Sequence, residues 1–163
     1  GCYTCFPAGT QILMANGTKK NIEKVKNGDK VIGYNGKTNI TETVLATESP
    51  IRDHLYKLSL QDGTTLSLTR EHPLFTQNGW SSISPESTLQ ENHNLHVHKM
   101  NIGDKVLKAN GKYIKITAIK YIPGKVQTYN LKTVTGYNNF YANDVLAHNK
   151  DGDGGAPPAC CVN

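Results

Sequence analysis

Asn-Gly and Asp-Gly dipeptides punctuate the chain, and this spacing of turns constrains the fold more than any other feature. Such dipeptides accept the positive φ angles of tight hairpin turns. The segments between them are rich in Val, Ile, Thr, Tyr and Leu, which favour strands. Five of these dipeptides mark the predicted turns: Asn16-Gly17, Asn35-Gly36, Asp62-Gly63, Asn78-Gly79 and Asn110-Gly111. We therefore expect an all-β fold that is compact and strongly curved.

The predicted strands are short, and no helix longer than about two turns is expected. The strands are predicted at residues 30–34, 55–60, 64–69, 113–121 and 127–134. Residues 19–25 form at most a short turn or helix. Two stretches have no strand pattern: residues 81–99 are polar and read as a long loop, and residues 150–163 read as a flexible tail or linker.

An internal repeat indicates two similar halves. Residues 28–37 read GDKVIGYNGK and residues 103–112 read GDKVLKANGK. Two halves related by an approximate twofold would share one core, although coincidence between common turn motifs is the alternative. One copy of the repeat lies in the first part of the chain and the other in the second part, so both parts are expected to belong to the same unit. We expect one folded unit over residues 5–149, flanked by residues 1–4 and 150–163.

Composition narrows the function classes. A chain of 163 residues with 37% apolar residues fits one globular domain. No stretch approaches the ~20 apolar residues of a membrane span, and no secretory signal is recognisable. The chain does not begin with Met, so we expect it to be part of a longer host protein. The localisation of that host stays open, with a secreted or cell-surface protein as one alternative.

The net charge of +5 raises the question of nucleic-acid binding. Arg52 and Arg70 are the only arginines among the 18 basic residues, and the lysines are scattered without runs. Base readout and bidentate phosphate contacts favour arginine. A solvated lysine surface is therefore expected, with no nucleic-acid partner and no membrane partner.

Two motifs could carry nucleophilic chemistry. Cys5 lies in the segment CFPAGT, and a thiol is the best side-chain nucleophile near neutral pH, although a lone Cys can also be a small core residue. Thr69 and His72 lie three residues apart after a predicted strand and before Pro73. A hydroxyl and an imidazole on one turn could converge on one target, although surface pairs of this kind are common.

The dipeptide His148-Asn149 lies where the folded sequence meets the predicted tail. The side-chain nitrogen of Asn can attack its own carbonyl, which forms a succinimide and cuts the chain after itself. A neighbouring imidazole would accelerate this step by acid–base catalysis. The position of the dipeptide, rather than its composition, makes it a candidate.

The other cysteines and histidines leave alternatives open. Cys2 and Cys5 near the start, with Cys160 and Cys161 near the end, could bind Zn²⁺ or form disulfides. Adjacent cysteines make a poor zinc knuckle, so no metal is predicted; a regulatory Cys2–Cys5 disulfide that blocks the nucleophile stays possible. The His-rich segment at residues 93–98, with His96 and His98 on one strand face, is a weak second metal candidate. No cofactor is predicted.

Taken together, these motifs resemble the inteins, and more closely the type A bacterial intein-like domains of the Hint (hedgehog/intein) superfamily. The resemblance covers residues 5–149. It rests on the segment CFPAGT, the Thr69-x-x-His72-Pro73 motif, both Gly-Asp-x-Val segments and the NNFYA segment that leads to His148-Asn149. The fold it implies is a pseudo-twofold, horseshoe-like all-β structure with adjacent termini.

The resemblance also implies roles. Cys5 would attack the Thr4 carbonyl and turn the peptide into a thioester, while Thr69 and His72 bind that peptide and His72 protonates the leaving nitrogen. Asn149 would cyclise with the help of His148 and cut the bond to Lys150. Each molecule would act once, on its own flanking segments and as a monomer, so the domain is not a multiple-turnover enzyme.

Three positions depart from the usual intein pattern. Lys150 stands where inteins carry the Cys, Ser or Thr that receives the N-terminal segment, so the resemblance implies cleavage at the two ends and inefficient splicing. Asn130 and Asn138 stand where many inteins carry Asp and His, which predicts slower chemistry. Two other classes of protein fit less well: a binding module would not explain Cys5 and Asn149, and a zinc-stabilised domain would leave His-Asn without a role.

Overall fold

The computed structural model describes residues 4–149, and within them the fold is all-β, as predicted. The strands of the first half are β1 (Phe6–Pro7), β2 (Gln11–Leu13), β3 (Lys19–Asn21), β4 (Lys30–Tyr34), β5 (Asn39–Glu48), β6 (Ile51–Leu60) and β7 (Thr65–Leu68). Those of the second half are β8 (Leu74–Thr76), β9 (Gly79–Ser82), β10 (His98–Lys99), β11 (Lys105–Leu107), β12 (Tyr113–Val134), β13 (Asn139–Ala142) and β14 (Val145–His148). A 3-10 turn covers Ile22–Lys24, and one α-helix, α1, covers Pro85–Glu91.

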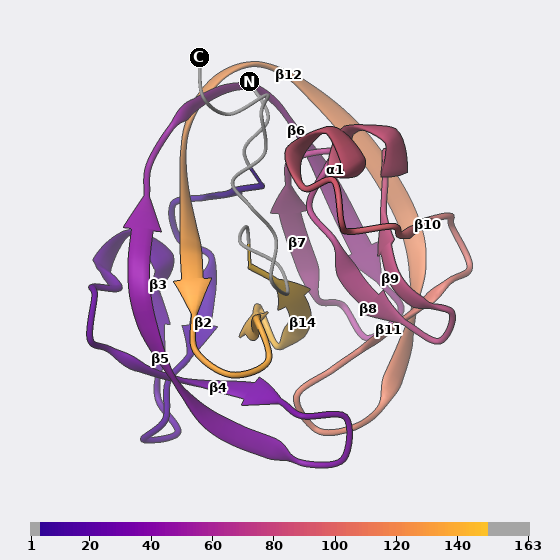
Figure 1. Cartoon of the computed structure of the whole chain (residues 1–163). Coiled ribbons are helices and arrows are strands. Elements are labelled where there is room, and N and C mark those ends of the chain that lie inside the picture. Colours follow the sequence, from indigo (N-terminus) through magenta and orange to yellow (C-terminus); the bar gives the residue numbers. More distant parts are fainter. Residues whose placement is uncertain (1–3, 150–163) are drawn as a thin grey trace.

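The long strand β12 organises the fold. Its first part pairs with β11 and then with β6, and its last part pairs with β1 and β5. Figure 1 shows β12 curving up one side of the molecule, over the top and down the other side, with β14 between the two arms. This curvature gives the horseshoe-like form expected from the sequence. Strands β13 and β14 pair with each other and connect β2 to β8.

The sequence repeat is also a repeat of backbone hydrogen bonds. The Gly28 amide donates to the Val44 carbonyl (2.7 Å), and the Gly103 amide donates to that of Ile116 (2.8 Å). Each following Asp caps its own turn: Asp29 Oδ2 accepts from the Lys26 amide, and Asp104 Oδ2 accepts from the equivalent amide two residues before Gly103. Both copies therefore build the same turn before the same kind of hairpin, as two similar halves would.

The larger of two hydrophobic clusters forms the main core. It takes residues from strands of both halves, including Phe6, Val31, Leu68, Leu131 and Phe140, all fully buried. Burying apolar surface of this extent is the main stabilising contribution to such a fold. Since Phe6 belongs to this core, the residue before it, Cys5, is drawn inside with it.

Two sequence predictions were wrong in detail. Residues 81–99 are not a plain loop, because α1 lies there with Ser84 as its N-cap and Pro85 in its first turn. Residues 113–121 and 127–134 are not separate strands, since β12 is continuous. Pro123 still pairs with His54 of β6, and the ladder then shifts register before Val126, which accommodates the missing proline N–H as a bulge.

Candidate active site

The turn after β7 holds the backbone of Cys5 on both of its polar groups. The Cys5 amide donates to Oγ1 of Thr69 at 2.9 Å, and the Thr69 amide donates to the Cys5 carbonyl at 3.1 Å. Both residues are fully buried. The nitrogen of the Thr4–Cys5 peptide bond therefore faces a hydroxyl rather than another strand.

The residue before Cys5 is held by its side chain. Oγ1 of Thr4 donates to Oε1 of Glu91 at 2.9 Å and accepts from Nδ2 of Asn130 at 3.2 Å. All three residues are buried. Glu91 comes from the end of α1, and Asn130 comes from β12, so two distant elements converge on Thr4.

The Cys5 thiol is protonated at neutral pH. Burial raises the pKa of this thiol well above its usual value, and the nearby carboxylates of Glu48 and Glu91 raise it further. The hydrogen bond with Thr128 lowers this pKa by less than burial raises it but by more than either carboxylate does, and the charge of Arg52 lowers it least. A nucleophile of this kind needs a neighbouring base.

His72 lies between the two ends of the domain. Its Nε2 is 3.0 Å from the carbonyl oxygen of His148, and its ring packs on Phe6 with centroids 4.1 Å apart. A carbonyl oxygen only accepts hydrogen bonds, so Nε2 carries the proton and Nδ1 of the neutral ring is unprotonated. Within residues 4–149, Nδ1 has no hydrogen-bond partner. Burial lowers the pKa of His72 to about 3, although the backbones of His148 and Cys5 favour its charged form.

At the other end, Asn149 is held by hydrogen bonds to residues from separate parts of the chain. Its amide donates to the Asn138 carbonyl (2.9 Å), its side-chain Nδ2 donates to the Lys132 carbonyl (3.1 Å), and its own carbonyl oxygen lies 2.6 Å from Nδ1 of His148. Asn138 has a φ of 60° and closes the turn into β13. The imidazole of His148 is therefore directed at the carbonyl of Asn149.

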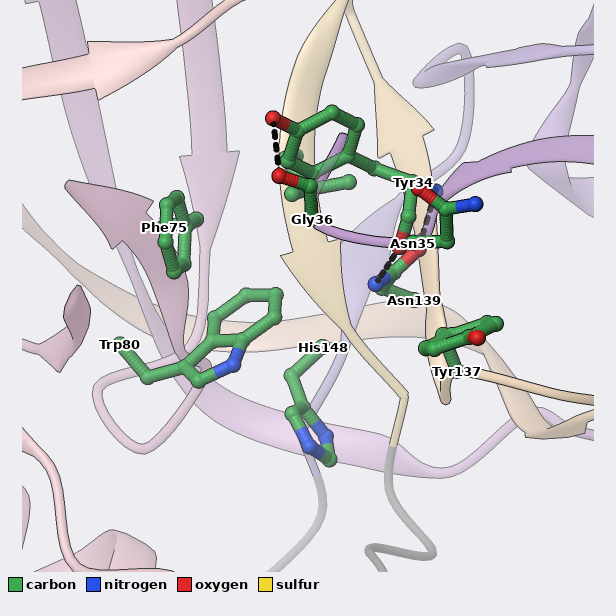
Figure 2. Close-up of a pocket in the computed structure, with 9 residues that line it drawn as sticks. Tyr34, Asn35, Gly36, Phe75, Trp80, Tyr137, Asn139 and His148 are labelled. Carbon is green, nitrogen blue, oxygen red and sulfur yellow. Dashed lines mark hydrogen bonds between the residues drawn. The ribbon is translucent and has the colours of Figure 1, made fainter. Parts of the chain in front are cut away.

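A pocket of about 230 Å³ reaches the imidazole of His148. Figure 2 shows the Trp80 and His148 rings facing each other at one side, with Tyr34 and Asn139 on the other. The Trp80 and His148 rings meet edge to face, with centroids 4.9 Å apart. The pocket therefore opens beside the imidazole of His148.

Strand β6 anchors the turn that carries Thr69 and His72. Arg52 forms a buried ion pair with Glu71, and Nε2 of His54 accepts from the backbone amide of Arg70 at 3.0 Å. Because Nε2 of His54 is the acceptor, its Nδ1 carries a proton and donates to Asp53 at 2.8 Å. The turn is therefore fixed at each of its two central residues.

The structure thus brings Cys5, Thr69, His72, His148 and Asn149 together. The histidines of residues 93–98 are exposed, and the part of the chain that the structure describes holds no cluster of three or more His, Cys, Asp or Glu suited to a metal. Cys2, Cys160, Cys161 and Lys150 lie outside the described residues, and so does the proposed disulfide. No helix among residues 4–149 is long and apolar enough to cross a membrane.

Sequence reasoning missed several residues of this site. Glu91, Arg52, Glu71 and Thr128 were not singled out, and Asn130 was noted only as a replacement for Asp. The Ser84-Pro85 pair, a typical helix start, was the available signal for α1 and hence for a structured segment before Glu91. No local pattern announces the contact between Thr4 and Glu91, which are 87 positions apart.

A curved, pseudo-twofold all-β domain whose two ends meet at one histidine is the architecture of the Hint class. The solution structure of a bacterial intein-like domain from Clostridium thermocellum is similar, at 30% identity and a TM-score of 0.72, over 89% of this chain and 98% of that one. The gp41-1 intein matches at 25% identity and a TM-score of 0.69, over 90% and 98% of the two chains. This chain belongs to the bacterial intein-like domains with the Hint fold.

Other comparisons match at lower identity or over less of the chain. A DnaB intein from Synechocystis sp. PCC 6803 shares the fold, with a TM-score of 0.71 at 19% identity over 90% of this chain and 98% of that one. Residues 6–110 match the family model of the Ataxin-1 and HBP1 module (AXH), a match that stops before β12, β13 and β14. A stretch of 32 residues, 20% of this chain, is 53% identical to a V-type proton ATPase catalytic subunit from Candida tropicalis; it spans 3% of that protein.

Proposed function

We propose that this domain cuts its own polypeptide at two bonds, Thr4–Cys5 and Asn149–Lys150. The observation that carries the proposal is the position of His72, whose ring contacts the backbone at His148 and packs beside the segment that holds Cys5. Both candidate bonds are thus served by one buried site. The intein-like family to which the chain belongs supports the same assignment.

At the N-terminal bond, Sγ of Cys5 attacks the carbonyl carbon of Thr4. A carbon–sulfur bond forms, the carbon–nitrogen bond breaks, and the thiol proton ends on the new amine of Cys5. The unprotonated Nδ1 of His72 is suited to relay that proton, because the raised pKa of the thiol leaves little thiolate. The Thr69 hydroxyl at the departing nitrogen supports the orientation of the bond.

At the C-terminal bond, Nδ2 of Asn149 attacks the carbonyl carbon of Asn149 itself. A succinimide forms, and Lys150 leaves with a free amine. Nδ1–H of His148 lies 2.6 Å from the carbonyl oxygen and would stabilise the negative charge that develops there. The Lys132 carbonyl accepts a hydrogen bond from Nδ2, which orients the attacking nitrogen; one proton of Nδ2 is lost as the new carbon–nitrogen bond forms and ends on the amine of Lys150.

Lys150 decides the balance between cleavage and splicing. The side-chain amine of Lys150 is normally protonated, and in that form it cannot accept the acyl group from the thioester. We therefore propose cleavage at one or both ends as the main outcome, with inefficient splicing. The self-processing domain is residues 5–149, and its partners are its own flanks, residues 1–4 and 150–163. It acts once per molecule and as a monomer. We propose no metal, nucleic-acid or membrane partner. Asn130 and Asn138 would make both steps slower than in inteins that carry Asp and His there.

The test uses intact-mass spectrometry of the 163-residue chain with and without dithiothreitol. Cys5→Ala should abolish thiol-induced cleavage after Thr4 and leave cleavage after Asn149, whereas Asn149→Ala should do the reverse. Cys5→Ser is a matched control, because an ester can still form at a reduced rate. Fragment patterns that are the same in both variants would contradict the proposal.

A further inference from the structure

We propose that the site selects a residue with a side-chain hydroxyl, Thr or Ser, immediately before the nucleophile Cys5. Glu91 and Asn130 would be the residues that read it. This inference rests on the proposed function, since position 4 supplies the acyl group that Cys5 receives. It adds a requirement on the host sequence next to the domain.

The hydroxyl of Thr4 is matched on both of its hydrogen-bonding roles. A hydroxyl has one proton to give and lone pairs to accept with. Oε1 of Glu91 accepts a hydrogen bond from this hydroxyl at 2.9 Å, and Nδ2 of Asn130 donates one to it at 3.2 Å. Because Thr4, Glu91 and Asn130 are 3%, 1% and 1% exposed, water cannot replace either partner easily. An apolar side chain at position 4 would leave a buried carboxylate oxygen and a buried amide without these bonds.

These contacts act on the reacting bond from one side. The carbonyl carbon of Thr4 is the atom that Cys5 attacks, and the side chain of Thr4 branches from the adjacent Cα. Fixing the hydroxyl therefore restricts the position of Cα and, together with the bond from the Cys5 amide to Thr69, the orientation of that carbonyl. The Thr69 hydroxyl holds the nitrogen of the same bond from the other side. Small losses of orientation are costly in such reactions.

The helix α1 links the two sides. Thr88 and Glu91 lie one turn apart on it, three residues in sequence, so they share a face. Oγ1 of Thr88 donates to the carbonyl of Glu71 at 2.7 Å, inside the turn that carries Thr69 and His72. Glu91 meets Thr4 from the same face. Residues 81–99, which sequence analysis treated as a loop, therefore supply the side chain that contacts Thr4.

The same geometry gives Asn130 a purpose of its own. With Asp at this position, two carboxylates would face one hydroxyl, which has a single proton to share. The amide of Asn130 instead supplies the donor that the Thr4 oxygen needs. Asn130 and Glu91 thus form a complementary donor and acceptor pair around a hydroxyl.

The experiment compares Thr4→Ser with Thr4→Val, which has nearly the shape of Thr but no hydroxyl. The rate of dithiothreitol-induced release of residues 1–4 from the full chain is measured by mass spectrometry. Thr4→Ser should cleave at a rate close to that of the wild type. Thr4→Val should be about 10- to 100-fold slower, the loss typical of a hydrogen bond to a charged group. Cleavage after Asn149 should proceed equally in all three, which shows that each variant is folded.

A double-mutant cycle separates recognition from general damage. Glu91→Leu should slow the wild type and Thr4→Ser, but should add little to Thr4→Val, because the contact is already lost. Equal N-terminal rates for wild type, Thr4→Ser and Thr4→Val would overturn this inference while leaving the proposed function intact. A wild type that never releases residues 1–4 would overturn the proposed function and this inference with it.

Discussion

Nε2 of His72 lies 3.0 Å from the carbonyl oxygen of His148, across 76 positions of sequence. This contact brings the turn after β7 to the end of β14, and the ring of His72 also covers Phe6 beside the nucleophile. Because the imidazole of His72 contacts residues next to both proposed cleavage sites, it could couple the two cleavage reactions. It also commits the fold to keeping an imidazole uncharged in its interior.

Replacing Lys150 tests why the chain should cleave rather than splice. Lys150→Cys supplies a thiol at the position where the acyl group would be received, so the flanks 1–4 and 150–163 should become joined in one peptide. Mass spectrometry should detect that ligated peptide in reducing buffer. Lys150→Ala is the matched control and should release both flanks separately, the outcome also expected for the wild type. A variant with Cys that gives only separate flanks would show that another feature prevents splicing.

Acid should destabilise the fold through His72. The pKa of His72 is lowered to about 3 in the folded chain and is near 6.5 when unfolded, so between these values the unfolded state binds the extra proton. The contribution of the neutral His72 to the free energy of unfolding is fully present above about pH 6.5. It is lost by up to about 1.4 kcal/mol per pH unit as the pH falls from there towards 3. Urea denaturation at pH 7 and pH 5 measures this loss.

His72→Asn is the reference for that titration, and its loss of stability between pH 7 and pH 5 should be smaller. Glu42 acts in the opposite direction, since burial raises the pKa of its carboxyl to about 7 and so favours the folded state as the pH falls. The comparison between wild type and His72→Asn cancels this contribution. Identical pH dependence in the two chains would contradict a buried neutral His72.

The ion pair between Arg52 and Glu71 should matter for both stability and chemistry. Arg52→Met leaves the carboxylate of Glu71 buried without its partner, which should cost about 3–5 kcal/mol and displace the turn that carries Thr69. Thermal and urea unfolding measure the first effect, and thiol-induced cleavage after Thr4 measures the second.

The double variant Arg52→Met with Glu71→Leu is the control for this pair. Removing both charges should recover much of the stability, because no isolated charge remains in the interior. Equal destabilisation by the single and double variants would mean that the pair contributes through packing rather than charge.

Local signals predicted the framework of the fold well. The glycines of the five turn dipeptides all have positive φ, between 85° at Gly111 and 103° at Gly79. The repeated segments build equivalent turns, and residues 30–34 form β4 as predicted. These features depend on residues close in sequence, so pattern alone is sufficient to find them.

The missing parts depend on contacts between distant residues. Glu91 meets Thr4, and Arg52 of β6 meets Glu71 of the following turn, through packing that no single segment encodes. Helix α1 is only seven residues long, and a polar stretch of that length resembles a loop unless its cap is noticed. The motif residues could be named from resemblance, but the side chains that hold them became visible only in three dimensions.

The most direct test of the account is the capture of its thioester. The 163-residue chain is incubated with 2-mercaptoethanesulfonate, and the released peptides are identified by mass spectrometry. The account predicts residues 1–4 as the sulfonate thioester from the wild type and none from Cys5→Ala. Release of that peptide in equal amount from Cys5→Ala, or its absence from a folded wild type that still cuts after Asn149, would contradict it.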